Sequence, residues 1–269
     1  MKKGLYFSFR MKNALSVAVT VLLFGSLTVM LNFIGVLSDS SVSAKAEALP
    51  VIVIDAGHGG EDGGTQSSDG TLEKKINLEI SLKINELLLG RGFTTVLTRE
   101  GDYMIYDESS STQREKKVSD IHNRMKIVEE NGDCILLSIH QNYFKESKYS
   151  GTQVFYSKNN PESEYLADEI QKAVVSELQT DNTRQIKESG TDIYLLYHAK
   201  VPSVMVECGF MSNEKESELL KDEDYQKKMA EAIVSGLIKY LESKPEGEIN
   251  YGNEDEKHLC MQQLWLRDR

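Results

Sequence analysis

An apolar run that ends in a glycine-rich turn constrains this chain more than any other feature. Four apolar, mostly β-branched residues, Val51–Ile54, are typical of a strand buried on both faces, as parallel strands are in α/β domains. The run is followed by Asp55 and by a turn, Gly57–Gly60, that contains His58. Glycines allow a sharp turn where the strand ends, and ligands of open α/β sheets bind outside the carboxyl ends of the strands. His58 is therefore placed for binding or catalysis.

Two further buried-strand patterns end in chemically active side chains. Cys134–Ile139 is followed by His140, and Ser203–Val206 is followed by Glu207. Because the carboxyl ends of parallel strands meet at one edge of a sheet, we expect these side chains to lie close to His58.

Glu73 is a fourth candidate, at the start of an amphipathic segment that follows a glycine-rich loop. An acidic residue in the first turn of a helix can simply interact with the helix dipole. The two histidines at strand ends favour a role as a ligand instead. Two histidines and a carboxylate form a common ligand set of catalytic zinc, and a second carboxylate nearby can act as general base.

The glycine-rich stretch 57–70 does not have the spacing of a nucleotide-binding loop. It lacks both G-x-G-x-x-G and the Gly-Lys-Ser/Thr ending of a P-loop. We therefore do not expect a nucleotide site there.

The first 46 residues have the character of a targeting segment. Four basic residues, Lys2, Lys3, Arg10 and Lys12, precede the uncharged apolar stretch 14–36, and Ser43–Ala46 offers a small-residue cleavage site. Residues 1–46 are therefore predicted to be a signal peptide. The stretch 14–36 is also long enough to span a bilayer, so an uncleaved membrane anchor is the alternative. Both interpretations predict that the protein is exported across the cytoplasmic membrane and is then either secreted or membrane-anchored.

The remainder of the chain is long enough for one domain with a sizeable core. The whole chain has a formal charge of −11, and the basic leader makes the rest more acidic still. Nucleic-acid binding depends on Lys and Arg neutralising phosphates, so we expect no nucleic-acid partner. Cys134 and Cys208 lie on or just after strand patterns and are expected to be small apolar core residues rather than parts of a disulfide framework.

The periodicity of apolar residues predicts alternating strands and helices, and hence an α/β fold. The segment 181–190 is expected to be a loop, and 244–269 a polar tail. The predicted strands are 51–54, 93–99, 134–139, 152–157, 193–197 (a strand or an extended segment) and 203–206, and the predicted helices are 76–88, 118–128, 166–178, a short acidic helix after 213, and 225–240.

Three other residues have side chains that can bind a substrate. Arg124, on the predicted second helix, can be structural or can reach a substrate carboxylate. His122 is expected to be an exposed or capping residue of the same helix. For His198 we favour packing or solvent exposure over contact with substrate.

Four motifs together resemble the zinc-dependent N-acetylmuramoyl-L-alanine amidases of the Amidase_3 type. They are Ile54–Gly60, Glu73, Ser138–Asn142 and Val206–Asn213, and the resemblance covers roughly residues 50–241. It implies a catalytic domain over 47–243, with a twisted, mostly parallel or mixed sheet of about six strands and helices on both faces.

The resemblance also assigns roles to the candidate residues. It implies that His58, Glu73 and His140 hold one Zn²⁺ ion and that Glu207 is the catalytic glutamate. The implied substrate is peptidoglycan, cut at the amide between the lactyl group of N-acetylmuramic acid and the first L-alanine. A zinc peptidase acting within the stem peptide is an alternative, as is a wall-binding module without activity. A wall-binding module without activity would be expected to have lost a metal ligand or the catalytic glutamate. All four of these positions carry residues able to do the chemistry, which argues against the module.

A leader followed by a bare catalytic domain is similar to the germination-specific spore cortex amidases. These enzymes act on the route to muramic-δ-lactam. A vegetative autolysin of the same class is the alternative. The sequence has no wall-binding repeats and no room for a long autoinhibitory insert between His140 and Glu207, so we also expect a regulatory partner protein. The tail 244–269 has no counterpart in the family.

Overall fold

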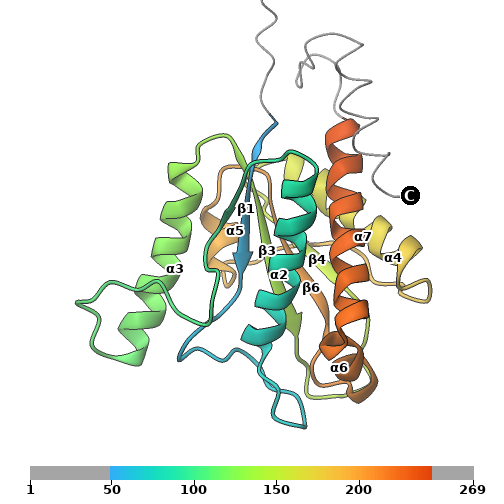
Figure 1. Cartoon of the computed structure of the whole chain (residues 1–269), viewed down its shortest axis with the longest axis horizontal. Helices are drawn as coiled ribbons and strands as arrows, with labels where there is room; N and C mark the ends of the chain where they lie inside the picture. The colour runs from blue at the N-terminus through green and yellow to red at the C-terminus, as the bar shows by residue number, and fades with distance from the viewer. Residues whose placement is uncertain (1–48, 244–269) are drawn as a thin grey trace, which may run out of the picture. The chain divides into compact units, whose positions relative to one another are not determined.

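The computed structural model describes residues 49–243, which form a mixed six-stranded sheet with helices on both faces (Figure 1). The strand order is β2-β1-β3-β6-β4-β5, and β6 and β4 are the only antiparallel pair among these strands. The predicted α/β fold is therefore confirmed. The strands are β1 (Val51–Ala56), β2 (Thr95–Leu97), β3 (Cys134–Asn142), β4 (Gln153–Tyr156), β5 (Lys187–Glu188) and β6 (Ser203–Phe210).

The helices divide into two layers that bury opposite faces of the central strands. Helices α2 (Glu73–Gly90), α4 (Glu162–Glu177) and α7 (Glu223–Glu242) cover one face, and α3 (Gln113–Glu130) and α5 (Tyr194–His198) cover the other. The short helix α6 (Glu214–Lys221) packs against β6 and α7.

Alternate residues of β1 point into the two layers, which explains its continuous apolar sequence. Ile52 and Ile54 belong to the core formed with α2, α4 and α7, whereas Val53 packs with Met125 of α3 and Leu195 of α5. Cys134 and Cys208 are buried free thiols, as predicted.

Helix α3 begins earlier than the apolar pattern alone predicts. Thr112 and Glu115 form a capping box, in which Thr112 Oγ1 accepts from the Glu115 amide at 3.2 Å and the Glu115 carboxylate accepts from the Thr112 amide at 2.9 Å. The Thr-x-x-Glu spacing is a sequence signal for such a start. The helix therefore begins at Gln113 rather than near Val118.

Two local predictions were wrong. Residues 193–197, expected to be a strand or extended segment, belong largely to helix α5, in which Leu195 and Leu196 are buried. The loop predicted at 181–190 contains the two-residue strand β5. Both elements are too short for their periodicity to be read, and their conformation depends on contacts with the rest of the fold.

Within residues 49–243, no helix is both long and apolar enough to cross a membrane. The leader 1–46, its apolar stretch 14–36 and the tail 244–269 lie outside the described residues.

Candidate metal centre

The candidate residues meet at one edge of the sheet, as the strand-end patterns predict. His58 follows β1, His140 lies in β3, and Glu207 lies in β6 directly opposite His140. Glu73 is the first residue of α2. Three adjacent parallel strands and one helix thus contribute the four side chains.

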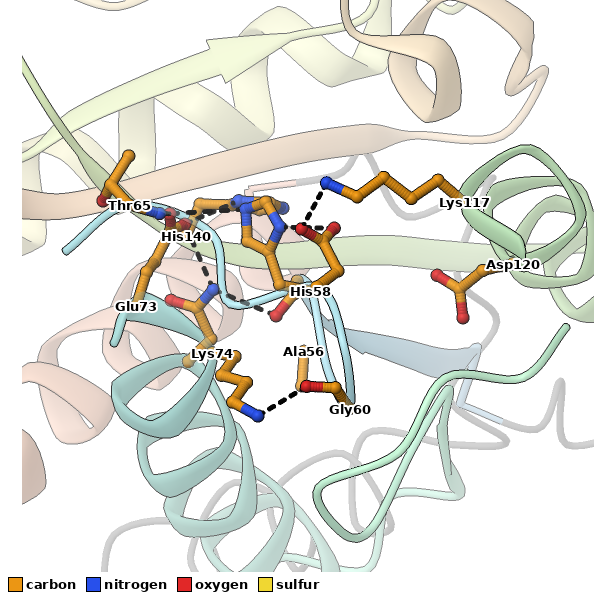
Figure 2. Close-up of polar contacts among 12 residues, drawn as sticks. Ala56, His58, Gly60, Thr65, Glu73, Lys74, Lys117, Asp120 and His140 are labelled. Atoms are coloured by element: carbon orange, nitrogen blue, oxygen red, sulfur yellow. Dashed lines mark hydrogen bonds and ion pairs between the residues drawn. The ribbon is translucent and has the colours of Figure 1, made fainter. Parts of the chain in front are cut away.

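Glu73 contacts both histidines (Figure 2). Its Oε1 lies 3.0 Å from His140 Nδ1, and its Oε2 lies 3.3 Å from His58 Nε2. One ligand atom from each of the three residues falls within 4.8 Å of the other two. Two imidazole nitrogens and a carboxylate oxygen at this spacing fit a zinc ion and leave a coordination position open.

Glu73 is held in place as a charged group. Only 2% of its surface is exposed, and it accepts hydrogen bonds from the amides of Thr65 (2.8 Å) and Gln141 (3.1 Å) and from Asn77 Nδ2 (3.2 Å). Burial tends to raise the pKa of Glu73, but hydrogen bonds with His140 and His58 outweigh this and hold the pKa well below its usual range.

His58 is oriented through its other ring nitrogen. Nδ1 lies 2.8 Å from Asp62 Oδ2, and Asp62 is also paired with Lys117 at 2.7 Å. Burial lowers the pKa of His58, yet the hydrogen bonds with Asp62 and Glu73 raise it to about 9. A carboxylate on the far nitrogen of a metal-binding histidine is the usual supporting interaction at such sites. A metal ion bound to His58 Nε2 would replace the proton that this nitrogen carries when the imidazole is protonated.

Glu207 differs from Glu73 in its surroundings. Its Oε2 atom is buried and has no hydrogen-bond partner among the described residues. Burial raises the pKa of Glu207 to about 7, although the nearby His140 acts to lower it. A carboxylate with a pKa near neutrality suits a general base that accepts and returns a proton.

Arg124 has the structural role, one of the two that the sequence left open. Its side chain is 2% exposed and donates to Asp55 Oδ1 and Asp120 Oδ2, both at 2.7 Å. It also donates to the carbonyls of Ala56 and His58 at 2.7 Å. Arg124 therefore fixes the backbone that carries His58.

A second buried arginine supports the same turn. Arg99 Nε donates to the Ala56 carbonyl at 2.8 Å, and its Nη2 donates to the Gly57 carbonyl at 3.0 Å. Asp55, beneath the turn, accepts from Ser138 Oγ at 2.6 Å; burial raises the pKa of Asp55, but Arg124 and Ser138 lower it to about 2. No sequence pattern marks Arg99 as a support of this turn, although a charged Asp55 at the end of an apolar strand is a signal for such a role.

His122 and His198 are not part of the metal group. Both side chains are exposed, and their rings lie 5.1 Å and 4.2 Å from the ring of Tyr194. The predicted exposure of His122 is confirmed, and His198 is exposed and packs against Tyr194, as favoured.

A cavity of about 290 Å³ adjoins the metal group between α3 and α5. His58 and His140 form its wall at the sheet, and Lys117, Asp192 and Tyr194 line the opposite side. A substrate bound at the metal can extend into this cavity.

Gly57→Ala should weaken zinc binding. A β-carbon at position 57 would overlap the imidazole ring of His140, so the ring must leave its present position beside Glu73. We expect the Kd for zinc to rise about 10–100-fold, the usual cost of disturbing the support of a metal ligand. Competition with a chromophoric chelator measures this. Gly90→Ala, which places a β-carbon in open space, is the control; equal zinc affinity in both variants would contradict the prediction.

Glu207→Gln should stabilise the metal-free protein at pH 8 but not at pH 4.5. The folded-state pKa of about 7 exceeds the ordinary value of 4.5, so the folded state binds more protons between these values. Stability contributed by the protonated carboxyl is therefore lost as pH rises through 7. Urea unfolding in the presence of a chelator measures this, with Glu188→Gln on exposed β5 as the control. A shift of the midpoint that is the same at both pH values would contradict it.

The fold and the site fit a metal-dependent hydrolase, since three side chains that could hold a metal ion lie beside a second carboxylate. Residues 52–239 match the model of the Amidase_3 family, described as N-acetylmuramoyl-L-alanine amidase. The chain belongs to this family, and it is an enzyme that acts on peptidoglycan.

Individual relatives agree with the family model. The germination-specific N-acetylmuramoyl-L-alanine amidase of Bacillus subtilis is 32% identical over 194 residues, which are 72% of this chain and 81% of that protein. The CwlD amidase from Clostridioides difficile, solved in complex with the GerS lipoprotein, is 43% identical with a TM-score of 0.71, over 73% of this chain and 100% of that one. The amidase AmiC2 of Nostoc punctiforme is 30% identical with a TM-score of 0.62, over 72% and 97%.

Proposed function

We propose that this amidase uses one zinc ion held by His58, Glu73 and His140, with Glu207 as the general base. The observation that carries the proposal is the position of Glu207. Its Oε2 atom, buried and without a hydrogen-bond partner within residues 49–243, belongs to the residue directly opposite the proposed ligand His140. An unpaired buried carboxylate oxygen is costly for stability, so its retention at this place points to a use in catalysis.

The residues of the site have separate tasks in the hydrolysis. When bound, zinc supplies Lewis acidity that polarises the amide carbonyl and lowers the pKa of water to about 7. Glu207 accepts the proton of the attacking water and returns it to the leaving amine of L-alanine. Asp62 keeps His58 Nε2 directed at the centre, and the amides of Thr65 and Gln141 keep the Glu73 carboxylate in place.

The relatives support a role in the spore cortex. The Bacillus subtilis relative is germination-specific by name, and the Clostridioides difficile neighbour is an amidase solved with a lipoprotein. We infer that this chain removes stem peptides from cortex peptidoglycan on the route to muramic-δ-lactam, and that a partner protein regulates it. Within this proposal, residues 1–46 direct export as a signal peptide or anchor, 47–243 are the catalytic domain, and 244–269 are an accessory tail. The site of action is the cell wall or the forespore intermembrane space.

Mass spectrometry of digested cortex peptidoglycan tests the function. The zinc-loaded protein should release intact stem peptides with a free L-alanine amine. A chelator should abolish the release, and added zinc should restore it, because the metal ligands remain in place. Vegetative peptidoglycan digested in parallel distinguishes the autolysin alternative. Cleavage within the stem peptide, or release that is unaffected by the chelator, would refute the proposed reaction.

A further inference from the structure

Polar side chains continue past Glu207 along the same edge of the sheet. In the strand register, Glu207 of β6 lies opposite His140 on one side and opposite Gln153 of β4 on the other. Directly opposite residues share a face of the sheet, and adjacent strands lie about 4.8 Å apart, so Gln153 is roughly 10 Å from His140. The Gln153 Oε1 atom accepts a hydrogen bond from Arg184 Nη2. Arg184 thus ends a row that begins at a metal ligand.

Three aromatic residues follow one another outward from Arg184 and form what we term the aromatic shelf: Phe210, Tyr149 and Phe144. The Arg184 guanidinium lies 4.9 Å from the centre of the Phe210 ring. The rings of Phe210 and Tyr149 are 6.3 Å apart, and those of Tyr149 and Phe144 are 5.0 Å apart and nearly perpendicular. Phe210 is 3% exposed but Phe144 is 48% exposed, so the shelf is anchored at its inner end and open at its outer end.

The loop that carries the shelf is held by hydrogen bonds. The Phe144 amide donates to Ser212 Oγ at 3.1 Å, and Asn213 Nδ2 donates to the Tyr149 carbonyl at 3.3 Å. Lys148 Nζ lies 5.2 Å from the centre of the Tyr149 ring. The exposed aromatic surface is therefore largely preformed, which lowers the entropic cost of binding a ligand.

The chemistry of the shelf fits an N-acetylated sugar. The faces of a sugar ring carry C–H groups that an aromatic side chain can cover, while its rim carries hydroxyl and acetamido groups. Arg184 presents a planar set of donors at the inner end of the shelf. Binding sites of this kind combine aromatic area with a few directed polar groups.

The two sides of the metal centre thus differ in character. On the α3–α5 side lies the cavity with charged groups, and on the β4 side lies Arg184, at the inner end of the shelf. We propose that the aromatic shelf, with Arg184, binds the N-acetylated glycan strand, so that the stem peptide points into the cavity. This inference rests on the proposed function, since the bond that is cut joins a sugar to a peptide.

Replacement of Phe144 tests the shelf. In Phe144→Ala, kcat/KM on intact glycan strands with stem peptides should fall about tenfold, the usual effect of removing one aromatic anchor from an interface. The kcat/KM on a lactyl peptide without a sugar should not change, and Phe144→Trp should retain activity on the strands. Tyr165→Ala, which removes an aromatic side chain that is 66% exposed on α4, is the matched control and should behave as the parent.

Binding of an N-acetylglucosamine hexasaccharide, measured by calorimetry on the zinc-loaded protein, tests the shelf without catalysis. Phe144→Ala should weaken this binding and Tyr165→Ala should not. Unchanged kcat/KM on glycan strands in Phe144→Ala, equal losses on the sugar-free substrate, or unchanged hexasaccharide affinity would each overturn the inference. If the parent itself releases no stem peptides, the proposed function fails, and the hexasaccharide experiment still decides on the shelf.

Discussion

Glu207→Gln should reduce kcat by about 10³-fold or more, because the variant cannot accept the proton of the attacking water. The side-chain amide of glutamine has nearly the same shape as the carboxylate of Glu207, and the three proposed metal ligands are unaltered. Zinc content measured by atomic absorption should therefore equal that of the parent protein. Rates of stem-peptide release from cortex peptidoglycan measure the loss.

The control for this prediction is Glu188→Gln, which removes an exposed carboxylate of β5 and should leave kcat unchanged. Retention of a tenth or more of the parental kcat by Glu207→Gln would show that another group accepts the proton. A large loss of zinc would instead place Glu207 among the residues that hold the metal.

Arg124→Met should lower the free energy of unfolding by about 3–5 kcal/mol, the cost of removing one partner from a buried charge pair. The change leaves Asp55 and Asp120 without their cation and the carbonyls of Ala56 and His58 without a donor. Methionine keeps much of the apolar volume, so the loss comes from the charges. Urea denaturation followed by circular dichroism measures it.

Lys126→Met on the same helix is the matched control. Lys126 is 67% exposed and lies 3.7 Å from Glu130, and exposed pairs of this kind contribute about 0–1 kcal/mol. If Arg124→Met and Lys126→Met lower the free energy of unfolding by the same small amount, the charged cluster around Asp55 does not stabilise the protein. Since Arg124 fixes the His58 carbonyl, its loss should also weaken zinc binding.

The central strands could be predicted because they are buried on both faces. Such strands need apolar side chains at most positions, so β1, β3 and β6 each contain a continuous apolar run. His58, His140 and Glu207 stand out because each breaks or follows such a run. Glu73 could not be separated from an ordinary first-turn acid by its sequence position alone, and it joins the histidines only through the packing of α2 on the sheet.

The supporting side chains could not be predicted in the same way. Asp62 and Arg99 act through contacts made by the folded turn around His58, and no spacing in the sequence records these contacts. The positive φ of 62° at His58 also depends on that turn. Helix α5 and strand β5 are determined by neighbours rather than by their own short sequences.

The strand order sets when activity can arise during folding. Strand β6 is inserted between β3 and β4, although both precede it in the chain. Until β6 enters, the strands made earlier can form only two separate groups, β2-β1-β3 and β4-β5. The first group already contains His58 and His140, but Glu207 arrives with β6 itself. With Glu207 as the proposed general base, a newly made chain can therefore assemble its proposed metal ligands early and gains activity only when β6 joins the two halves of the sheet.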